Sequence, residues 1–317
     1  CQNNVKNLAL AAMNYESANK RWPTSGEGKI PTISSGTITG YSTKMNLESF
    51  QVQIMPFIEQ IAVASKWDKK LPYWDTTGNN NSQLATTKIA TFLCPSNAVY
   101  KPENGGTSAA GGYYGSNDYM PVVYTDLSGD DGTRVGSTSK WYKRGVMRGD
   151  QTSRVADVLD GTSNTVLFFE DAGRDTMHVG TYAADGSNNW ISTASVDPVY
   201  LTFTPSGDMP SNKTIPNRWA DPDNGSGVSG PPDEQSTTRT RPIINNLKTP
   251  IGGDSSKCLW TANNCGPNGE PFSFHSGGGC FAGFADGSSH WMGEGLDVQV
   301  IRQLCDPADI EAPKKFE

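Results

Sequence analysis

Apolar residues recur every three to four positions in the first twenty residues and predict an amphipathic helix. Val5, Leu8, Ala12 and Met13 lie on one face of such a helix, with asparagine and lysine side chains opposite. Pro23 marks the end of the pattern, because proline cannot continue a helix. We expect the apolar stripe to pack against the rest of the protein.

Other segments carry shorter patterns. Residues 46–68 have helical periodicity interrupted by a proline, and residues 86–97 are typical of a short strand that runs into a turn. Residues 166–169 are apolar on both faces, which predicts a central strand. Residues 296–307 predict a short helix with Asp297 as its N-cap.

The high glycine and proline content predicts that much of the chain forms loops. The 317 residues include 34 glycines and 20 prolines. Residues 205–246 are dominated by Pro, Gly, Asp, Ser and Thr, which predicts a loop-rich insertion with little regular structure. We therefore expect an α+β fold, in which residues 1–24 form an amphipathic helix packed on one antiparallel, β-rich head of residues 25–317.

The charge pattern narrows the choice of partners. The formal net charge is −7 and no basic cluster occurs, which argues against a nucleic-acid partner. No run of 18 apolar residues is present, so the printed sequence predicts no membrane-spanning helix.

Six cysteines occur, and none has C-x-x-C spacing. Cys258 and Cys265 flank a short loop that a disulfide closes easily in an oxidising compartment, so we predict that pair. The alternative is that the cysteines are buried free thiols.

Asp286–Gly287 stands between two apolar runs and predicts a β-hairpin. An Asp-Gly pair favours a two-residue type I′ turn, which would place Ala282 opposite Trp291. Asp160–Gly161 lies between two further apolar runs and predicts another turn.

His275 precedes a glycine run that includes Gly277 and predicts a further tight turn, giving three successive antiparallel strands. His275 and Asp286 then lie at opposite ends of the strand 280–285, roughly 20 Å apart. A general base and its orienting carboxylate need hydrogen-bond contact. We therefore predict structural roles for both residues and no catalytic pair.

Other catalytic and metal motifs are weak. No serine occupies a G-x-S-x-G turn. The three histidines, His178, His275 and His290, are too scattered to predict a metal site. We expect no enzymatic activity and no cofactor.

Two acidic turns are candidate calcium-binding sites. Asp126 and Asp130 alternate in one turn that lacks the remaining ligands of an EF-hand loop, and Asp221 and Asp223 belong to another. We interpret both as solvated turns, with calcium binding as the alternative.

Five segments also carry a family likeness in a fixed order: residues 1–23, 54–60, 92–97, 158–171 and 275–287. Together they resemble a large family of bacterial prepilin-type proteins of unknown function with a C-terminal H-x(9)-D-G signature. Here ten residues, not nine, separate His275 from Asp286. We expect the extra residue in the Gly277–Gly279 turn or in a bulge.

The resemblance implies a structural subunit similar to pilins and pseudopilins, with a cleaved, methylated leader. The first half of their N-terminal helix is hydrophobic and lies in the inner membrane or the filament core, and here it would precede Cys1. A lipidated Cys1 is the alternative reading of this terminus. The implied partners are copies of itself or other pilin-like subunits.

The implied location is outside the cytoplasm, anchored in the inner membrane and exposed to the periplasm or the cell surface, as in a type IV pilus or a type II secretion apparatus. The alternative function is an extracytoplasmic module that recognises a polysaccharide or a protein through its loops.

Overall fold

The computed structural model describes most of the chain. The described residues are 1–25, 28–34, 37–44, 48–71, 73–98, 100–133, 135, 139–148, 153–173, 217–222, 224–228, 243–245 and 271–309. Among them, no helix has the length and apolar character needed to cross a membrane.

The first element is the predicted amphipathic helix, α1 (Gln2–Asn19). Val5, Leu8 and Ala12 are fully buried and Met13 packs against the core at its edge, which confirms the predicted stripe. The helix ends before Pro23, because Lys20 adopts a left-handed conformation with a φ of 57° and its N–H closes the last turn.

A six-stranded sheet forms the centre of the molecule. Neighbouring strands pair in the order β4 (Lys143–Arg144), β3 (Tyr119–Thr125), β5 (Val166–Glu170), β7 (Gly279–Phe284) and β8 (Ser289–Gly293). These pairs are antiparallel, whereas β6 (Ser226–Val228) pairs with β3 in parallel. β5 is buried along its whole length and lies between two other strands, as its apolar sequence predicts.

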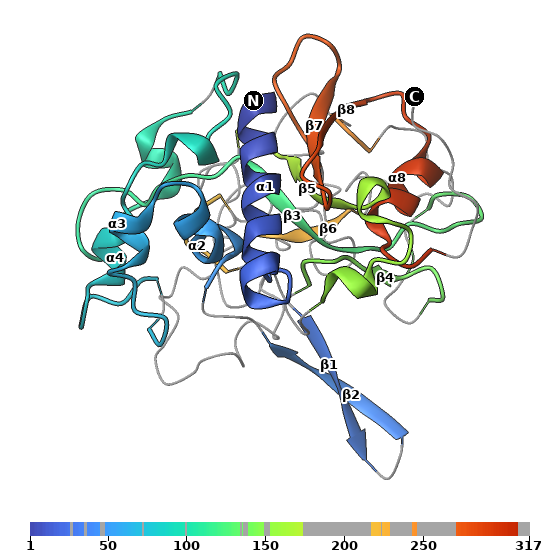
Figure 1. Ribbon diagram of the computed structural model, residues 1–317, viewed down its shortest axis with the longest axis horizontal. Helices are drawn as coiled ribbons and strands as arrows, with labels where there is room; N and C mark the ends of the chain where they lie inside the picture. Colours follow the sequence, from blue (N-terminus) through green and yellow to red (C-terminus); the bar gives the residue numbers. More distant parts are fainter. Residues whose placement is uncertain are drawn as a thin grey trace, which may run out of the picture.

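Helices cover both faces of this sheet (Figure 1). α1 and α2 (Phe50–Ile54) pack on one face with Phe168, whereas α8 (Val298–Cys305) packs on the other with Phe169. The two phenylalanines reach opposite faces because successive side chains of a strand alternate. Asp297 caps α8 by accepting a hydrogen bond from the Gln299 N–H, as predicted. The expected α+β class is confirmed.

The smaller elements lie around this framework. They are β1 (Gly28–Ser34) and β2 (Thr37–Lys44), which form an antiparallel pair, the short helices α3 (Ile61–Ala64) and α4 (Asn81–Leu84), and the 3₁₀ helices η1 (Met55–Phe57), η2 (Ala90–Phe92), η3 (Pro102–Gly105), η4 (Val155–Asp157) and η5 (Thr162–Asn164).

The strand expected within residues 86–97 is wrong. This segment forms η2, in which the buried side chains of Ile89 and Phe92 are three residues apart. That spacing matches a 3₁₀ turn rather than the two-residue alternation of a strand.

The hairpin between β7 and β8 exists, but its register differs from the prediction by one residue. Ala282 pairs with His290 rather than with Trp291. The turn has three residues, because the Gly287 N–H bonds to the Phe284 carbonyl and only Gly287 has a positive φ, of 81°. This is a type I turn followed by a left-handed glycine, so the predicted type I′ turn is wrong.

The segment before His275 does not supply a third antiparallel strand. Phe272 instead bridges to Asp171 in parallel, just beyond the end of β5. The ladder between β7 and β8 contains no bulge. The ladder between β5 and β7 does shift register between Val166 and Phe168, so the position of the extra residue between His275 and Asp286 stays a prediction.

The described residues of the 205–246 segment belong to the core. Trp219 and Asp221 have no exposed surface, and β6 adds to the central sheet. Ile243 and Ile244 are buried against the face that α8 covers. Among these described residues the only strand is β6, of three residues, and the buried stretches lie between polar and glycine-rich flanks that hid them from sequence reasoning.

Candidate functional site at the start of helix α1

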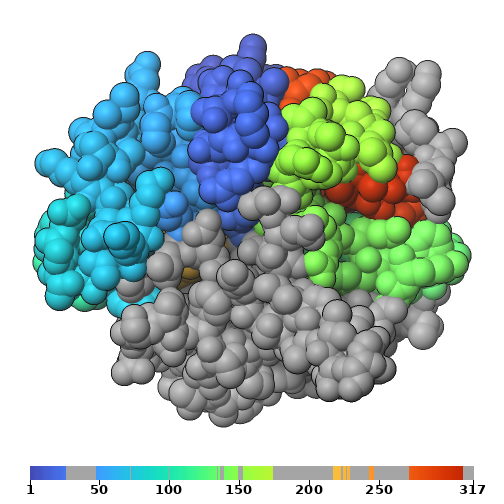
Figure 2. All heavy atoms as spheres, turned by 60° about the horizontal axis from the view of Figure 1, so that its bottom comes forward, coloured from blue at the N-terminus to red at the C-terminus, as the bar shows by residue number. Residues whose placement is uncertain are grey.

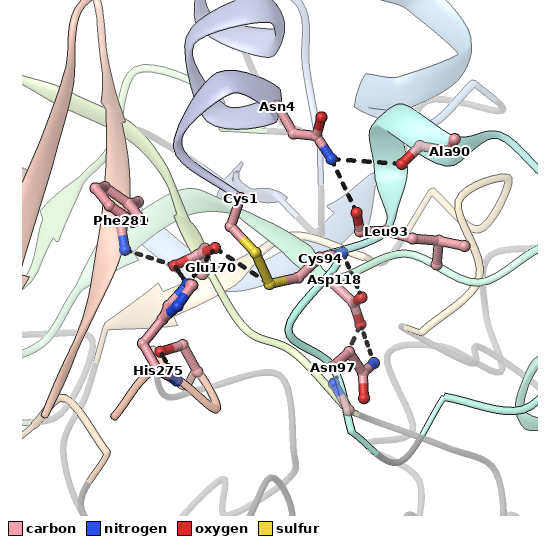
Figure 3. Close-up of a disulfide and its surroundings, with 12 residues drawn as sticks. Cys1, Asn4, Ala90, Leu93, Cys94, Asn97, Asp118, Glu170, His275 and Phe281 are labelled. Carbon is pink, nitrogen blue, oxygen red and sulfur yellow. Dashed lines mark hydrogen bonds and ion pairs between the residues drawn. A yellow bond between two sulfur atoms is a disulfide. The ribbon is translucent and has the colours of Figure 1, made fainter. Parts of the chain in front are cut away.

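A disulfide between Cys1 and Cys94 fixes the start of α1 to the segment that follows η2 (Figure 3). Asn4, in the first turn of the helix, supports the same contact by donating to the Leu93 carbonyl at 2.9 Å. The Cys94 N–H in turn donates to Asp118 Oδ2 at 2.8 Å. The N-terminal turn is therefore held to the body of the protein by covalent and polar contacts.

Sequence reasoning missed this pair, because the two cysteines are 93 positions apart. The available signal was the position of Cys1 at the start of an amphipathic helix. The predicted partners Cys258 and Cys265 lie outside the described residues. Cys280 and Cys305 are buried free thiols, as the alternative reading allowed.

Glu170, the last residue of β5, lies fully buried beside the disulfide. Its Oε2 accepts a hydrogen bond from the Phe281 N–H at 2.6 Å. Its Oε1 is 3.3 Å from His275 Nε2 and 3.5 Å from Cys94 Sγ. Figure 3 shows this carboxylate between the sulfur atoms and the histidine ring. Sequence reasoning did not select Glu170, because it ends an apolar strand without a recognisable motif.

Burial dominates the electrostatics of this carboxylate. Loss of solvent raises the pKa of Glu170, although the Phe281 N–H and the neighbouring His275 act in the opposite direction. Burial also raises the pKa of Tyr119, with a further contribution from the negative charge of Glu170. The cluster is thus a desolvated polar site inside the core.

The ring of His275 is positioned by two aromatic side chains. The rings of Phe281 and Trp291 contact it edge-on, with centroids 5.5 Å and 5.7 Å away. Trp291 lies over the glycine turn, where a Cβ at Gly277 would be 3.1 Å, and a Cβ at Gly279 2.7 Å, from its Cζ2 atom. The glycine run therefore leaves room for the tryptophan that orients His275.

The Asp286–Gly287 turn at the other end of β7 contacts the middle of α1. A Cβ on Gly287 would lie 2.6 Å from Met13 Sδ and 2.8 Å from Leu10 Cδ2. Asp286 stabilises the turn by accepting a hydrogen bond from the Ser288 N–H at 2.9 Å. His275 and Asp286 thus lie toward opposite ends of β7. His275 contacts Glu170 beside the disulfide, and Asp286 belongs to the turn that contacts α1.

The lengths of the two elements agree with this arrangement. The helix rises about 18 Å from Cys1 to Met13, and the strand from residue 280 to the turn spans roughly 20 Å. Figure 1 shows α1 running beside the β7–β8 hairpin. The disulfide therefore attaches the helix at its start, and the Gly287 turn contacts it at its middle.

The second predicted turn, Asp160–Gly161, lies between η4 and η5. Gly161 has a φ of 90°, a conformation that favours glycine. Asp160 Oδ2 accepts a hydrogen bond from the Asp309 N–H at 2.7 Å. This turn attaches the segment after α8 to the body of the protein.

The calcium candidates lie apart from the cluster at Cys1. Asp126 is buried, Asp130 accepts a hydrogen bond from the Trp141 indole, and Asp221 accepts one from the Tyr73 hydroxyl. Asp223 lies outside the described residues. Within the described part of the chain, the calcium candidates do not join a group of three or more histidine, cysteine, aspartate or glutamate side chains that could share an ion.

One such group does occur among the described residues, and it consists of Cys1, Cys94, Glu170 and His275. Of the other two histidines, His178 lies outside the described residues and His290 contacts the Ser288 hydroxyl. With the disulfide formed, the cluster is a covalent joint lined by a carboxylate and an imidazole. With the cysteines reduced, it offers two thiolates, an imidazole and a carboxylate.

The family model that matches this chain covers residues 1–299 and is described as "Protein of unknown function (DUF1559)". The chain belongs to this family. The match includes every residue of the cluster and the contact between the Gly287 turn and α1. No curated protein and no solved structure matches the chain.

Proposed function

We propose that this DUF1559 protein is a non-catalytic, pilin-like structural subunit whose helix α1 carries the head outside the cytoplasmic membrane. The observation that carries the proposal is the double attachment of α1, by a disulfide at its first turn and by the Gly287 turn at its middle. The resemblance to prepilin-type proteins supports it independently.

The attachment suits a subunit that is held through its helix. In this proposal, an upstream apolar segment of the complete gene product continues α1 into the membrane or the filament core. A pull on that segment reaches Cys1 first and passes through a covalent bond to Cys94 and the sheet. The non-covalent face of α1 then bears little of the load.

The outer face of α1 supplies a surface for neighbouring subunits. Figure 2 shows α1 at the molecular surface, and Asn7, Leu10 and Asn14 are exposed there. Leu10 is 41% exposed, although it is a large apolar residue in the middle of the helix. A disulfide also agrees with a location outside the cytoplasm, where thiols become oxidised.

Site-specific crosslinking in cells that express the complete gene tests the proposal. A photoreactive amino acid at Asn7 or Asn14 should capture another copy or another pilin-like subunit in the membrane fraction. The same probe at the exposed loop residue Asp131 serves as the control. Recovery of the protein as an uncrosslinked, freely soluble periplasmic species with all three probes would overturn the proposal.

A second candidate is an extracytoplasmic binding module, which one cavity favours. The cavity has a volume of about 460 Å³ and its lining includes Lys143, Arg144, Arg148 and Asp306. Such a lining suits an acidic sugar. Binding of a uronic-acid oligosaccharide that is lost in an Arg144→Ala variant would favour this candidate, and calorimetry without binding heat would argue against it.

A further inference from the structure

We propose that the reduced protein binds one zinc ion through Cys1, Cys94, His275 and Glu170. One donor atom of each residue lies within 4.8 Å of the other three. Thiolate, imidazole and carboxylate are the ligands that zinc accepts in tetrahedral sites. The site goes beyond the structural role proposed above and does not depend on it.

The spacing of the donors matches the geometry of this metal. A tetrahedral zinc with bonds of about 2.0 Å to nitrogen and oxygen and about 2.3 Å to sulfur separates nitrogen from oxygen by about 3.3 Å, and sulfur from oxygen by about 3.5 Å. Glu170 Oε1 is 3.3 Å from His275 Nε2 and 3.5 Å from Cys94 Sγ. Two of the separations that the ion requires, both from Glu170 Oε1, are therefore already present.

The surroundings hold these donors in place. His275 Nε2 lies 3.3 Å from both carboxylate oxygens of Glu170, and the Phe281 N–H fixes Oε2. Outer hydrogen bonds of this kind orient metal ligands. Asp118 fixes the backbone of Cys94. The His275 side chain is 18% exposed and Cys1 is partly exposed, which gives an ion a path from solvent to the buried ligands Cys94 and Glu170.

Reduction is the step that opens the site. A dithiol reductant donates two electrons and two protons, the Cys1–Cys94 bond breaks into two thiols, and the reductant becomes a disulfide. The two thiols then lose their protons to solvent as they bind zinc. When the disulfide bond is replaced by two zinc–thiolate bonds, the sulfur atoms move apart by about 2 Å. The start of α1 thus stays attached, by the bond in one state and by the ion in the other.

Metal analysis of the reduced protein tests the proposal. The protein is reduced with a dithiol under nitrogen, incubated with zinc chloride and freed of excess metal. A Cys258→Ser/Cys265→Ser background removes the two cysteines that lie outside the described residues. We expect one zinc per reduced chain and none in the oxidised chain. Absence of zinc from the reduced chain would overturn the proposal.

The ligands are identified by spectroscopy and by variants. Cobalt in place of zinc should give the visible bands of a tetrahedral ion with thiolate charge transfer, and X-ray absorption should find two sulfur ligands and two nitrogen or oxygen ligands. His275→Ala and Glu170→Gln should each weaken zinc binding by about tenfold or more. His290→Ala, on the adjacent strand, is the matched control and should bind normally.

Two results would exclude this site even if the variants lose stability. One is an X-ray absorption spectrum of the reduced, folded parent without sulfur ligands. The other is full zinc binding by a Cys1→Ser/Cys94→Ser variant, which would place the metal elsewhere in the chain. The near-ultraviolet circular dichroism of each variant reports whether its fold is retained.

Discussion

At the residue scale, Gly287 satisfies two independent requirements. Its φ of 81° lies in the region that favours glycine, and the surface of α1 leaves no room for a Cβ. The turn therefore depends on a glycine for its own shape and for its contact with Met13.

Alanine substitutions should distinguish the cost of the positive φ from the cost of a Cβ that contacts α1. We expect Gly287→Ala to lower the free energy of unfolding by about 1–3 kcal/mol. Gly111 also has a positive φ, of 93°, but has open space around it, and Gly295 has open space without this backbone constraint. Urea denaturation should therefore rank the losses as Gly287→Ala, then Gly111→Ala, then Gly295→Ala. Equal losses at residues 287 and 111 would show that the contact with α1 contributes nothing.

A second prediction at this scale concerns the Asp160 turn. Burial raises the pKa of Asp160, and the charges of Asp306 and Asp309 add to this effect. The folded protein therefore keeps this proton to a higher pH than the unfolded chain, so this group's contribution to stability falls as the pH rises through its folded pKa. Asp160→Asn keeps the oxygen that accepts from the Asp309 N–H but removes the titration.

Denaturation measured between about pH 4 and pH 7 tests this sign. The Asn variant should lose less stability than the parent as the pH rises over that range. Asp131→Asn is the control, because hydrogen bonds from Thr133 lower the pKa of Asp131. Its contribution to stability is lost only as the pH falls below about 4, so this variant should follow the parent over the measured range. A steeper loss of stability with rising pH in Asp160→Asn than in the parent would contradict the prediction.

At the element scale, the disulfide decides how firmly α1 is held. Cys1 and Cys94 close a loop of 93 positions. A closure of this size restricts the unfolded chain strongly, so we expect Cys94→Ser to lower the free energy of unfolding by about 2–5 kcal/mol. Cys1→Ser and the double variant should give the same loss, because each breaks the same bond. An effect in the double variant that equals the sum of the two single effects would show that the residues act separately.

The sequence predicts correctly those elements that are determined by residues close together in the chain. The stripe of α1, the apolar run of β5 and the Asp297 cap of α8 each need only neighbouring residues, and all three are confirmed. The hairpin register depends on whether its turn has two or three residues, which the Asp-Gly pair does not determine. The cluster joins Cys1 to Cys94 and Glu170 to His275 across 93 and 105 positions. Hydrophobic periodicity carries no information about contacts between residues so far apart in the sequence. Only the folded structure shows that these residues lie together.

At the scale of the whole molecule, the described residues of the glycine-rich 205–246 segment pack into the core. Trp219 is fully buried, its ring contacts those of Trp67 and Phe92, and its indole N–H donates to the Thr87 carbonyl at 2.9 Å. This residue therefore connects the 205–246 segment to the core beneath α1.

Truncation of that side chain should affect the entire head. We expect Trp219→Ala to lower the free energy of unfolding by about 3–5 kcal/mol. Tryptophan fluorescence and circular dichroism should still follow one common transition, shifted to lower urea. A separate early transition, with most of the stability retained, would instead show that this segment folds as an independent unit.

The two attachments of α1 also fix how the helix is rotated about its own axis. A helix turns by about 100° and advances 1.5 Å with each residue, so the number of residues between Cys1 and Met13 sets the direction in which its outer face points. One alanine inserted between Leu8 and Ala9 would rotate the two contacts relative to each other, and the chain could keep the disulfide or the Gly287 contact but not both. In a subunit carried by this helix, the number of residues between the two contacts therefore sets the rotational orientation of the head about the helix axis.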